Sequence, residues 1–183
     1  MALLDKFKGA KVLVTGHTGF KGTWLTLWLK QLGANVSGVS IDIPSKPSHF
    51  EATNLSTQID DHRLDIKDAD SLKKLIHDIQ PDFVFHLAAQ ALVRPSYEDP
   101  LETISTNTLG TANVLEALRT LDKSVVAVMI TSDKAYDNLE WVWGYRETDR
   151  LGGKDPYRAS KGMAELVIRT YGDSFFNSSS SNV

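Results

Sequence analysis

The most informative part of this sequence is residues 11–22, which read KVLVTGHTGFKG. The first five residues of this stretch are mostly branched and apolar, and they predict a buried strand. Gly16, Gly19 and Gly22 follow with the spacing G-x-x-G-x-x-G. The largely apolar residues 22–32 then predict a helix. A strand, a tight glycine turn and a helix are therefore expected in direct succession.

The rest of the chain continues to alternate strand and helix patterns. Short runs rich in apolar residues predict further strands at 35–41, 62–66, 83–87 and 124–131. Apolar spacing and prolines predict helices at 68–80, 100–121 and 156–171 and a loop at 44–60. Such alternation forms a parallel sheet with helices on both faces. We therefore expect an α/β fold, a Rossmann-like doubly wound parallel sheet with strand order 3-2-1-4-5.

Composition excludes several classes of protein. The 183 residues carry a net charge of −3, so no basic surface favours a nucleic-acid partner. No run of about 18 apolar residues predicts a membrane span, and charges interrupt the first residues before a signal peptide could form. The chain has no cysteine, which removes disulfides and thiolate ligands, and we expect no metal site. A cytoplasmic protein is expected.

The glycine turn predicts a site for a dinucleotide. A tight turn, a close backbone approach and a helix N-terminus together can hold a pyrophosphate. The residues expected to contact it are Gly16, Thr18, Gly19, Phe20, Lys21 and Gly22. Glycine-rich turns also occur for packing alone, so a second signal is needed to favour a ligand.

Acidic residues after the next two strands supply that signal. Asp42 follows the second strand about 20 residues beyond the last glycine, where a carboxylate can bind the adenosine ribose. An acid there repels a 2′-phosphate, which favours NAD over NADP. Asp65 and Ile66 are expected beside the adenine, although Asp65 is equally suited to cap the helix that follows.

Small residues end the fourth strand and would let a ligand approach the backbone. Leu87, Ala88, Ala89 and Gln90 are therefore expected to line the cofactor site. His86, just before them, is expected to be a packed strand histidine rather than a catalytic group.

Two clusters carry residues suited to acid–base chemistry. Tyr157 and Lys161 share one helix face, where the ammonium favours a phenolate that can accept a proton, and both are expected beside the nicotinamide. Ser132, Asp133 and Lys134 follow the fifth strand, at the edge of the sheet where ligands bind. The alternatives are a surface pair on the helix and a turn in which Asp133 only satisfies backbone donors.

With these motifs placed, the chain resembles the extended short-chain dehydrogenase/reductase family and, within it, the CDP-glucose 4,6-dehydratase branch. The resemblance covers essentially all of residues 9–177. It is carried by VTGHTGFKG (14–22), FHLAAQ (85–90), ITSDKAYDN (130–138), WVWGYRE (141–147) and DPYxxSK (155–161). The first two motifs are general to the superfamily, and the last three are typical of the CDP-sugar branch.

The resemblance implies a redox-neutral dehydration of CDP-glucose to CDP-4-keto-6-deoxyglucose with bound NAD. Tyr157 would take the C4 hydroxyl proton as hydride leaves C4, and Ser132 would hydrogen-bond the C4 oxygen. Lys134 would remove the C5 proton and Asp133 would protonate the departing C6 hydroxyl, before hydride returns to C6. The related dTDP-glucose dehydratases carry Glu in place of Lys134, and a lysine base must first lose its own proton.

The resemblance also implies a longer chain and a homodimer, formed through the helices at 100–121 and 157–171. Relatives continue into a sixth strand and a substrate-binding region, whereas this sequence ends before both. We expect residues 1–176 to form an NAD-binding Rossmann domain that carries the catalytic residues, with no C-terminal substrate domain. Residues 177–183, nearly all serine and asparagine, are expected to be a flexible tail. Turnover by this chain alone is expected to be poor.

Two other interpretations stay open. One is an epimerase, or a dehydratase for a dTDP or GDP sugar, although an epimerase does not need the acid–base pair at 133–134. The other is a non-catalytic NAD-binding protein, which would have no need of Tyr157 and Lys161. The two tryptophans of residues 141–147 suit a nucleotide contact and a packed loop anchor equally.

Overall fold

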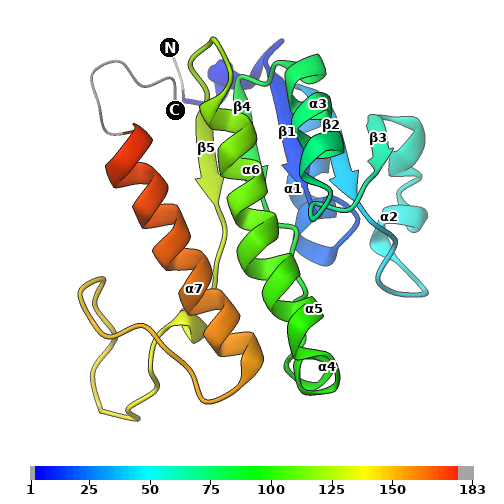
Figure 1. Cartoon of the computed structure of the whole chain (residues 1–183). Helices are drawn as coiled ribbons and strands as arrows, with labels where there is room; N and C mark the ends of the chain where they lie inside the picture. Colours follow the sequence, from blue (N-terminus) through cyan, green and yellow to red (C-terminus); the bar gives the residue numbers. More distant parts are fainter. Residues whose placement is uncertain (1–2, 177–183) are drawn as a thin grey trace.

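The computed structural model describes residues 3–176, and a parallel sheet forms the centre of the fold (Figure 1). The strands are β1 (Lys11–Thr15), β2 (Asn35–Ser40), β3 (Asp60–Arg63), β4 (Phe83–His86) and β5 (Val126–Met129). Their order, β3-β2-β1-β4-β5, confirms the doubly wound arrangement predicted from the sequence.

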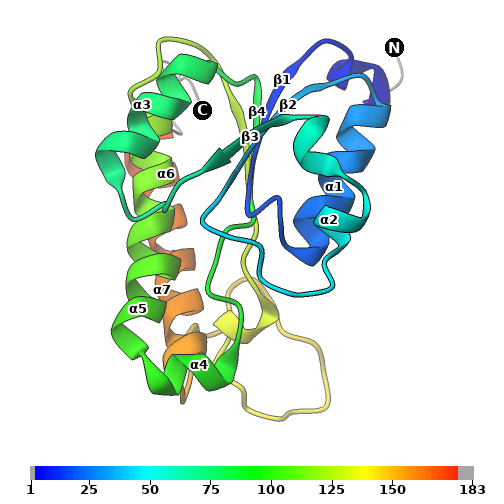
Figure 2. The same cartoon turned by 90° about the vertical axis from the view of Figure 1, so that its right-hand side faces the viewer.

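Helices cover both faces of this sheet. They are α1 (Phe20–Gln31), α2 (His49–Ala52), α3 (Ala69–Ile79), α4 (Val93–Glu98), α5 (Pro100–Ile104), α6 (Gly110–Arg119) and α7 (Pro156–Tyr171). Figure 2 shows α1 and α2 on one face and α3, α6 and α7 on the other. The described chain therefore folds as three layers, as an α/β protein must to bury both faces of a parallel sheet.

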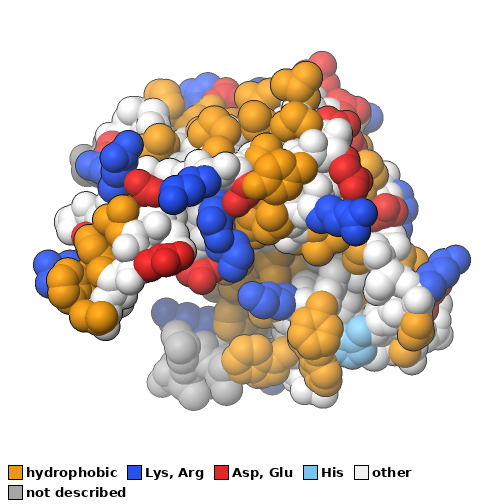
Figure 3. Space-filling view, turned by 90° about the horizontal axis from the view of Figure 1, so that it is seen from below, with side chains coloured by type: hydrophobic (Ala, Val, Ile, Leu, Met, Phe, Trp, Pro, Cys, Tyr) orange, Lys and Arg blue, Asp and Glu red, His pale blue; other side chains and the backbone are white. Residues whose placement is uncertain are grey.

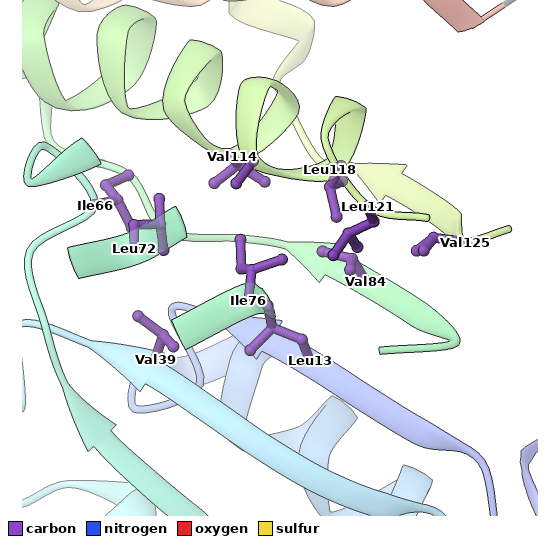
Figure 4. Packing of buried hydrophobic residues seen from close by; sticks show 11 residues of the cluster. Leu13, Val39, Ile66, Leu72, Ile76, Val84, Val114, Leu118, Leu121 and Val125 are labelled. Carbon is purple, nitrogen blue, oxygen red and sulfur yellow. The ribbon is translucent and has the colours of Figure 1, made fainter. Parts of the chain in front are cut away.

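β1 is buried on both sides because its side chains alternate between two apolar clusters. Val12 and Val14 pack with Leu29 of α1 and Val36 of β2. Leu13 points the other way, into the cluster that α3 and α6 supply (Figure 4). All three β1 side chains are 0% exposed, which explains why the sequence here is a continuous apolar run.

β5 has one covered face and one open face. Ala127 and Met129 pack against the cluster on the α6 side. Val126, Val128 and Ile130 alternate with them and remain 55%, 38% and 40% exposed. β5 is the outermost strand on this side of the sheet within the described residues, so this apolar row has no covering layer there.

The third strand differs from the prediction at 62–66. β3 begins two residues earlier, at Asp60, and ends at Arg63, paired with Ser37 to Ser40 of β2. It is an edge strand with the charged sequence Asp-Asp-His-Arg. Edge strands need little apolar surface, and charges discourage pairing with another chain, so the apolar pattern pointed to the wrong residues.

The loop predicted at 44–60 is wrong from residue 49 onward, where the chain forms α2 and then a 3₁₀ turn at Leu55–Thr57. Ser48 caps α2: its Oγ accepts from the Glu51 amide at 3.1 Å and donates to a Glu51 carboxylate oxygen at 2.8 Å. This serine N-cap begins a helix in spite of the nearby prolines.

The helix predicted at 100–121 is divided. α5 and α6 are joined by the π-helical residues Ser105–Leu109, and α4 precedes them without having been predicted. π-helical turns of this kind often occur at functional sites.

Within residues 3–176 no helix is both long and apolar enough to cross a membrane. The tail predicted at 177–183 lies outside the described residues.

Leu72→Ala tests the core on the α3 side of the sheet. Leu72 is 0% exposed, so the substitution leaves a cavity. We expect it to lower the free energy of unfolding by about 2–5 kcal/mol. Val142, 95% exposed, supplies the control Val142→Ala, for which a change within about 0.5 kcal/mol is expected. Urea unfolding followed by circular dichroism measures both, and equal midpoints would contradict this packing.

Candidate active site

The turn between β1 and α1 leaves no room for a side chain at Gly16 or Gly22. Gly16 has a φ of +75°, and a Cβ there would lie 2.7 Å from the Ala88 amide nitrogen. A Cβ at Gly22 would overlap the carbonyl oxygen of Gly16. Glycine is therefore required at both positions by packing. Packing and ligand binding are compatible explanations here, because the same contacts bring the backbones that follow β1 and β4 together at the carboxyl edge of the sheet.

The first turn of α1 has the features that a pyrophosphate needs. Gly19 is the N-cap residue and offers no side-chain hydrogen bond, and the first turn contains no acidic residue. The N–H groups that begin a helix have no partner within it, and the helix dipole favours an anion there. Phe20 and Lys21 are exposed on this turn. A dinucleotide fits this end of α1.

Thr18 and Asp42 connect the glycine turn to the end of β2. Thr18 Oγ1 donates to the Asp42 carbonyl oxygen at 2.7 Å, and Arg63 donates to the same oxygen at 3.2 Å. These bonds hold the Asp42 backbone, while its side chain is exposed. The structure thus places Asp42 beside the glycine turn.

His17 is a residue of the turn to which the sequence motif assigned no role. It is 0% exposed, with Nε2 2.9 Å from an Asp61 carboxylate oxygen and Nδ1 3.0 Å from Ser40 Oγ. Burial lowers the pKa of His17 in spite of the opposing charge of Asp61. A Cβ at Gly38 would overlap the imidazole ring, so this glycine makes the space for it.

Asp65 and Ile66 are placed less directly for a ligand. Asp68, not Asp65, caps α3, accepting from the Ser71 amide at 3.1 Å, so the cap alternative for Asp65 is wrong. Asp65 instead accepts from the Lys67 amide at 2.9 Å. The Ile66 side chain is 4% exposed and belongs to the core, which leaves only its backbone for a cofactor contact.

The end of β4 faces the glycine turn. Ala88 makes the close approach to Gly16 described above, and Leu87, Ala89 and Gln90 are half-buried beside it. His86 is 3% exposed, which confirms a packed strand histidine. Burial, with a smaller contribution from the charge of Lys161, lowers the pKa of His86 to about 3.

Tyr157 and Lys161 lie in the first turns of α7, which Asp155 caps by accepting from the Arg158 amide at 2.9 Å. Tyr157 is 7% exposed and Lys161 6%, so the alternative of a surface pair is wrong. Burial lowers the pKa of Lys161, and the carboxylate of Glu165 one turn later opposes that shift. Glu165 also accepts a hydrogen bond from Thr131 at the end of β5.

Ser132, Asp133 and Lys134 form a tight turn after β5. Ser132 Oγ accepts from the Lys134 amide at 3.2 Å and donates to an Asp133 carboxylate oxygen at 3.1 Å. The side chain that caps this turn is therefore Ser132. The alternative in which Asp133 satisfies the backbone donors of the turn is wrong. Asp133 and Lys134 are exposed.

The turn at 132–134 is held against α7. Ala135 is 2% exposed, and its carbonyl oxygen accepts from the Gly152 amide at 2.9 Å. A Cβ at Gly162 would lie 3.3 Å from the same oxygen, so the helix contacts the turn one residue after Lys161. Figure 1 shows this turn beside the lower end of α7, at the carboxyl edge of the sheet. That edge mixes apolar, basic and acidic side chains (Figure 3).

The loop between the turn and α7 carries stacked aromatic rings. Trp141 stacks on Trp143 with ring centres 5.5 Å apart and contacts Tyr145 at 5.3 Å. Trp143 is nevertheless 60% exposed. Trp141 is thus a packed loop anchor, and Trp143 is free to contact a ligand.

Three buried polar residues to which the sequence motifs assigned no role lie near these groups. Thr15, Asn107 and Thr111 are buried polar residues at the end of β1 and in the helical segment that follows α5. Three residues unfavourable to a helix stand together at 106–108, in the middle of a predicted helix, and this is the signal that would have drawn attention to Asn107.

The sheet order, the glycine turn and the helix bearing Tyr157 and Lys161 define a Rossmann-like fold of the short-chain dehydrogenase/reductase class. The chain belongs to the GDP-mannose 4,6 dehydratase family, whose model matches residues 13–181. It is 51% identical over 177 residues to the CDP-glucose 4,6-dehydratase of Salmonella typhimurium, covering 96% of this chain and 49% of that protein.

Solved structures agree with this assignment. The UDP-glucose 4-epimerase of Thermus thermophilus in complex with NAD is 30% identical with a TM-score of 0.76, covering 90% of this chain and 51% of that one. The UDP-glucuronic acid 4-epimerase of Bacillus cereus in complex with UDP-glucuronic acid and NAD is 29% identical with a TM-score of 0.74, covering 90% and 53%. The chain spans about half the length of these relatives.

The buried His86 makes stability depend on pH. Its pKa falls from 6.5 to about 3 on folding, so only the unfolded state takes up a proton as the pH drops below 6.5. The contribution is complete above that pH and is lost progressively toward pH 3. Between pH 7 and pH 5 we expect a loss of about 2 kcal/mol from this residue.

Urea unfolding at the two pH values measures this loss, and His86→Gln, which cannot be protonated in this range, is the comparison. The lowered pKa of His17 acts in the same direction in both proteins. A variant that retained the full wild-type dependence on pH would contradict the assignment to His86.

Proposed function

We propose that the protein carrying these residues is a hydro-lyase that converts CDP-glucose to CDP-4-keto-6-deoxyglucose, a step of deoxysugar biosynthesis in the cytoplasm. One observation carries the proposal: the Ser132–Asp133–Lys134 turn is held against the helix that bears Tyr157 and Lys161. An epimerase needs the helix but not the acid–base pair on the turn. The identity of 51% with a CDP-glucose 4,6-dehydratase supports the same reaction and nucleotide.

The cofactor of the proposed reaction is NAD. The first turn of α1 would hold its pyrophosphate, and the exposed Asp42 carboxylate would accept from the ribose hydroxyls and repel a 2′-phosphate. Asp65 and the backbone of Ile66 would lie at the adenine, and residues 87–90 would lie along the cleft. NAD, when bound, supplies a reversible hydride acceptor. Every proton transfer is left to this chain's own residues.

Tyr157 is the proposed base for the C4 hydroxyl proton. Its ring is buried at the start of α7, and the buried Lys161 follows one turn later on the same helix. Ser132 would orient the C4 oxygen.

Asp133 and Lys134 are the proposed acid and base of water elimination. Lys134 would take the proton from C5, which the adjacent ketone has acidified, and would return it to C5 as hydride returns to C6. Asp133 would give its proton to the departing C6 hydroxyl. Both side chains are exposed in the described chain, so the desolvation that a lysine base needs would come from the bound sugar.

The proposed protein is a homodimer. Leu101, Leu109 and Leu166, on α5, the π-helical segment and α7, are 75%, 58% and 52% exposed. Leu115 of α6, by contrast, is 3% exposed and belongs to the core. A second copy would cover the exposed leucines.

The reaction is tested by offering CDP-, dTDP-, GDP- and UDP-glucose or -mannose to the full reading frame that contains these residues. We expect CDP-glucose to lose one water, which mass spectrometry of the product measures. A product of unchanged mass but altered configuration would identify an epimerase. Binding of NAD without any conversion would identify a non-catalytic binder.

Tyr157→Phe removes the proposed base and retains the ring. We expect kcat to fall by about 10²- to 10⁴-fold, because the proton transfer loses its acceptor, with bound NAD unchanged. Tyr171→Phe, at the far end of the same helix, is the control, since that hydroxyl donates to Glu116, away from Ser132 and the glycine turn. Equal activity of the two variants would exclude Tyr157 as the base.

Leu109→Glu tests the dimer. A charge in the centre of the leucine face costs desolvation in the dimer and nothing in the monomer, so we expect a monomer by light scattering. Val142→Glu, in an exposed loop, is the control and should remain dimeric. A dimeric Leu109→Glu protein would place the interface elsewhere.

A further inference from the structure

His86 stands between two buried threonines at the carboxyl edge of the sheet. Its Nδ1 lies 2.7 Å from Thr15 Oγ1 on β1, and its Nε2 lies 3.1 Å from Thr111 Oγ1 on α6. The three residues are 3%, 0% and 4% exposed, in the order His86, Thr15, Thr111. No water is needed to complete these contacts.

The direction of each hydrogen bond follows from the number of protons. The Thr111 hydroxyl donates its proton to the Asn107 carbonyl oxygen at 2.7 Å, so it can only accept from His86, and Nε2 must carry the imidazole hydrogen. Nδ1 then accepts from the Thr15 hydroxyl. Thr15 Oγ1 in turn accepts from the amides of Leu87 and Ala88 at 3.2 and 3.1 Å. Every donor and acceptor is used once the ring is neutral.

These hydrogen bonds form a chain from Thr15 through His86, Thr111 and Asn107 to Ser160, called the relay below. At the Thr15 end, the relay reaches the proposed cofactor site. Thr15 precedes Gly16, and the amides that it binds belong to Leu87 and Ala88, the residues that approach Gly16. The hydrogen bond between His86 and Thr15 therefore adds a side-chain connection between β1 and β4 just before Gly16 and Ala88.

At the Ser160 end, the relay reaches α7, the helix that bears Tyr157. Asn107 donates to Ser160 Oγ at 2.8 Å and to the Gln90 carbonyl at 3.0 Å, and it accepts from the Gln90 amide at 2.8 Å. Ser160 Oγ donates to the Tyr157 carbonyl oxygen at 2.7 Å. The π-helical segment thus joins the loop after β4 to the backbone of Tyr157.

We propose that His86 is a positioning residue: through Thr15 on one side and Thr111–Asn107–Ser160 on the other, its neutral ring fixes Tyr157 relative to the backbones of Gly16 and Ala88. The inference rests on the proposed function for its catalytic consequence, and the hydrogen-bond relay itself is independent of it. The charged group facing the ring is the ammonium of Lys161 on α7, and Glu165 of that helix is bonded to Thr131 of the neighbouring strand. A neutral His86 ring avoids repulsion by the Lys161 ammonium throughout the pH range of the assays.

The relay is tested first without turnover. Nitrogen–proton correlation spectra of the imidazole should show the Nε2–H tautomer of His86, unchanged from pH 5.5 to pH 9. Thr111→Val should shift the amide resonances of Tyr157 and Ser160, because it removes the link and retains the shape. Thr26→Val is the matched control, since the Thr26 hydroxyl is buried and makes no hydrogen bond. An Nδ1–H tautomer, a ring that titrates in this range, or equal spectra of the two variants would overturn the relay.

The catalytic consequence is tested in the full reading frame with C4-deuterated CDP-glucose. Thr111→Val should lower kcat per bound NAD by about tenfold or more, leave KM within about twofold, and raise the deuterium isotope effect. His86→Gln, which keeps an N–H donor toward Thr111, should lose less than His86→Asn. If Thr111→Val and Thr26→Val have the same kcat and isotope effect, the positioning role is excluded. If the wild type converts no nucleotide sugar, the proposed function fails, and the spectra alone decide the relay.

Discussion

The contact between the backbones of Gly16 and Ala88 is the constraint on which the other features depend. It exists only because β1 and β4 are neighbours in the sheet and because Gly16 has no side chain. The same contact brings the start of α1 beside the end of β4, where a dinucleotide would be bound. Any residue with a Cβ at position 16 would push against the backbone of Leu87 and Ala88 and separate the ends of the two strands. The glycine is thus a requirement of folding and of binding together.

The structure places its polar groups around this contact in two separate networks. On the β2 and β3 side, His17 reaches Asp61 and Ser40 and ties the glycine turn to the outer strands. On the β4 and β5 side, His86 ties the same turn to α6 and α7. Both histidines are buried and have lowered pKa values. Each therefore joins neighbouring elements by hydrogen bonds as a neutral ring, in a region where burying a charge would be costly.

Much of the fold could be predicted because its signals are local. The bounds of α7, Pro156–Tyr171, match the prediction because an aspartate cap and a first-turn proline mark its start. β3 was misplaced because a charged edge strand has no apolar pattern. Of the site, Tyr157 and Lys161 could be paired from their spacing alone. The partners of His86 could not, because Thr15 and Thr111 are 71 and 25 residues away and are brought together only by sheet order and helix packing.

The open face of β5 has a consequence for handling the protein. Its row of valine and isoleucine side chains is uncovered, and its outer edge offers unpaired amide and carbonyl groups within the described chain. A strand of this kind is a template for addition of a strand from another molecule. Preparations restricted to these residues would therefore be expected to associate through β5 as their concentration rises, and a soluble yield would depend on whatever covers that strand.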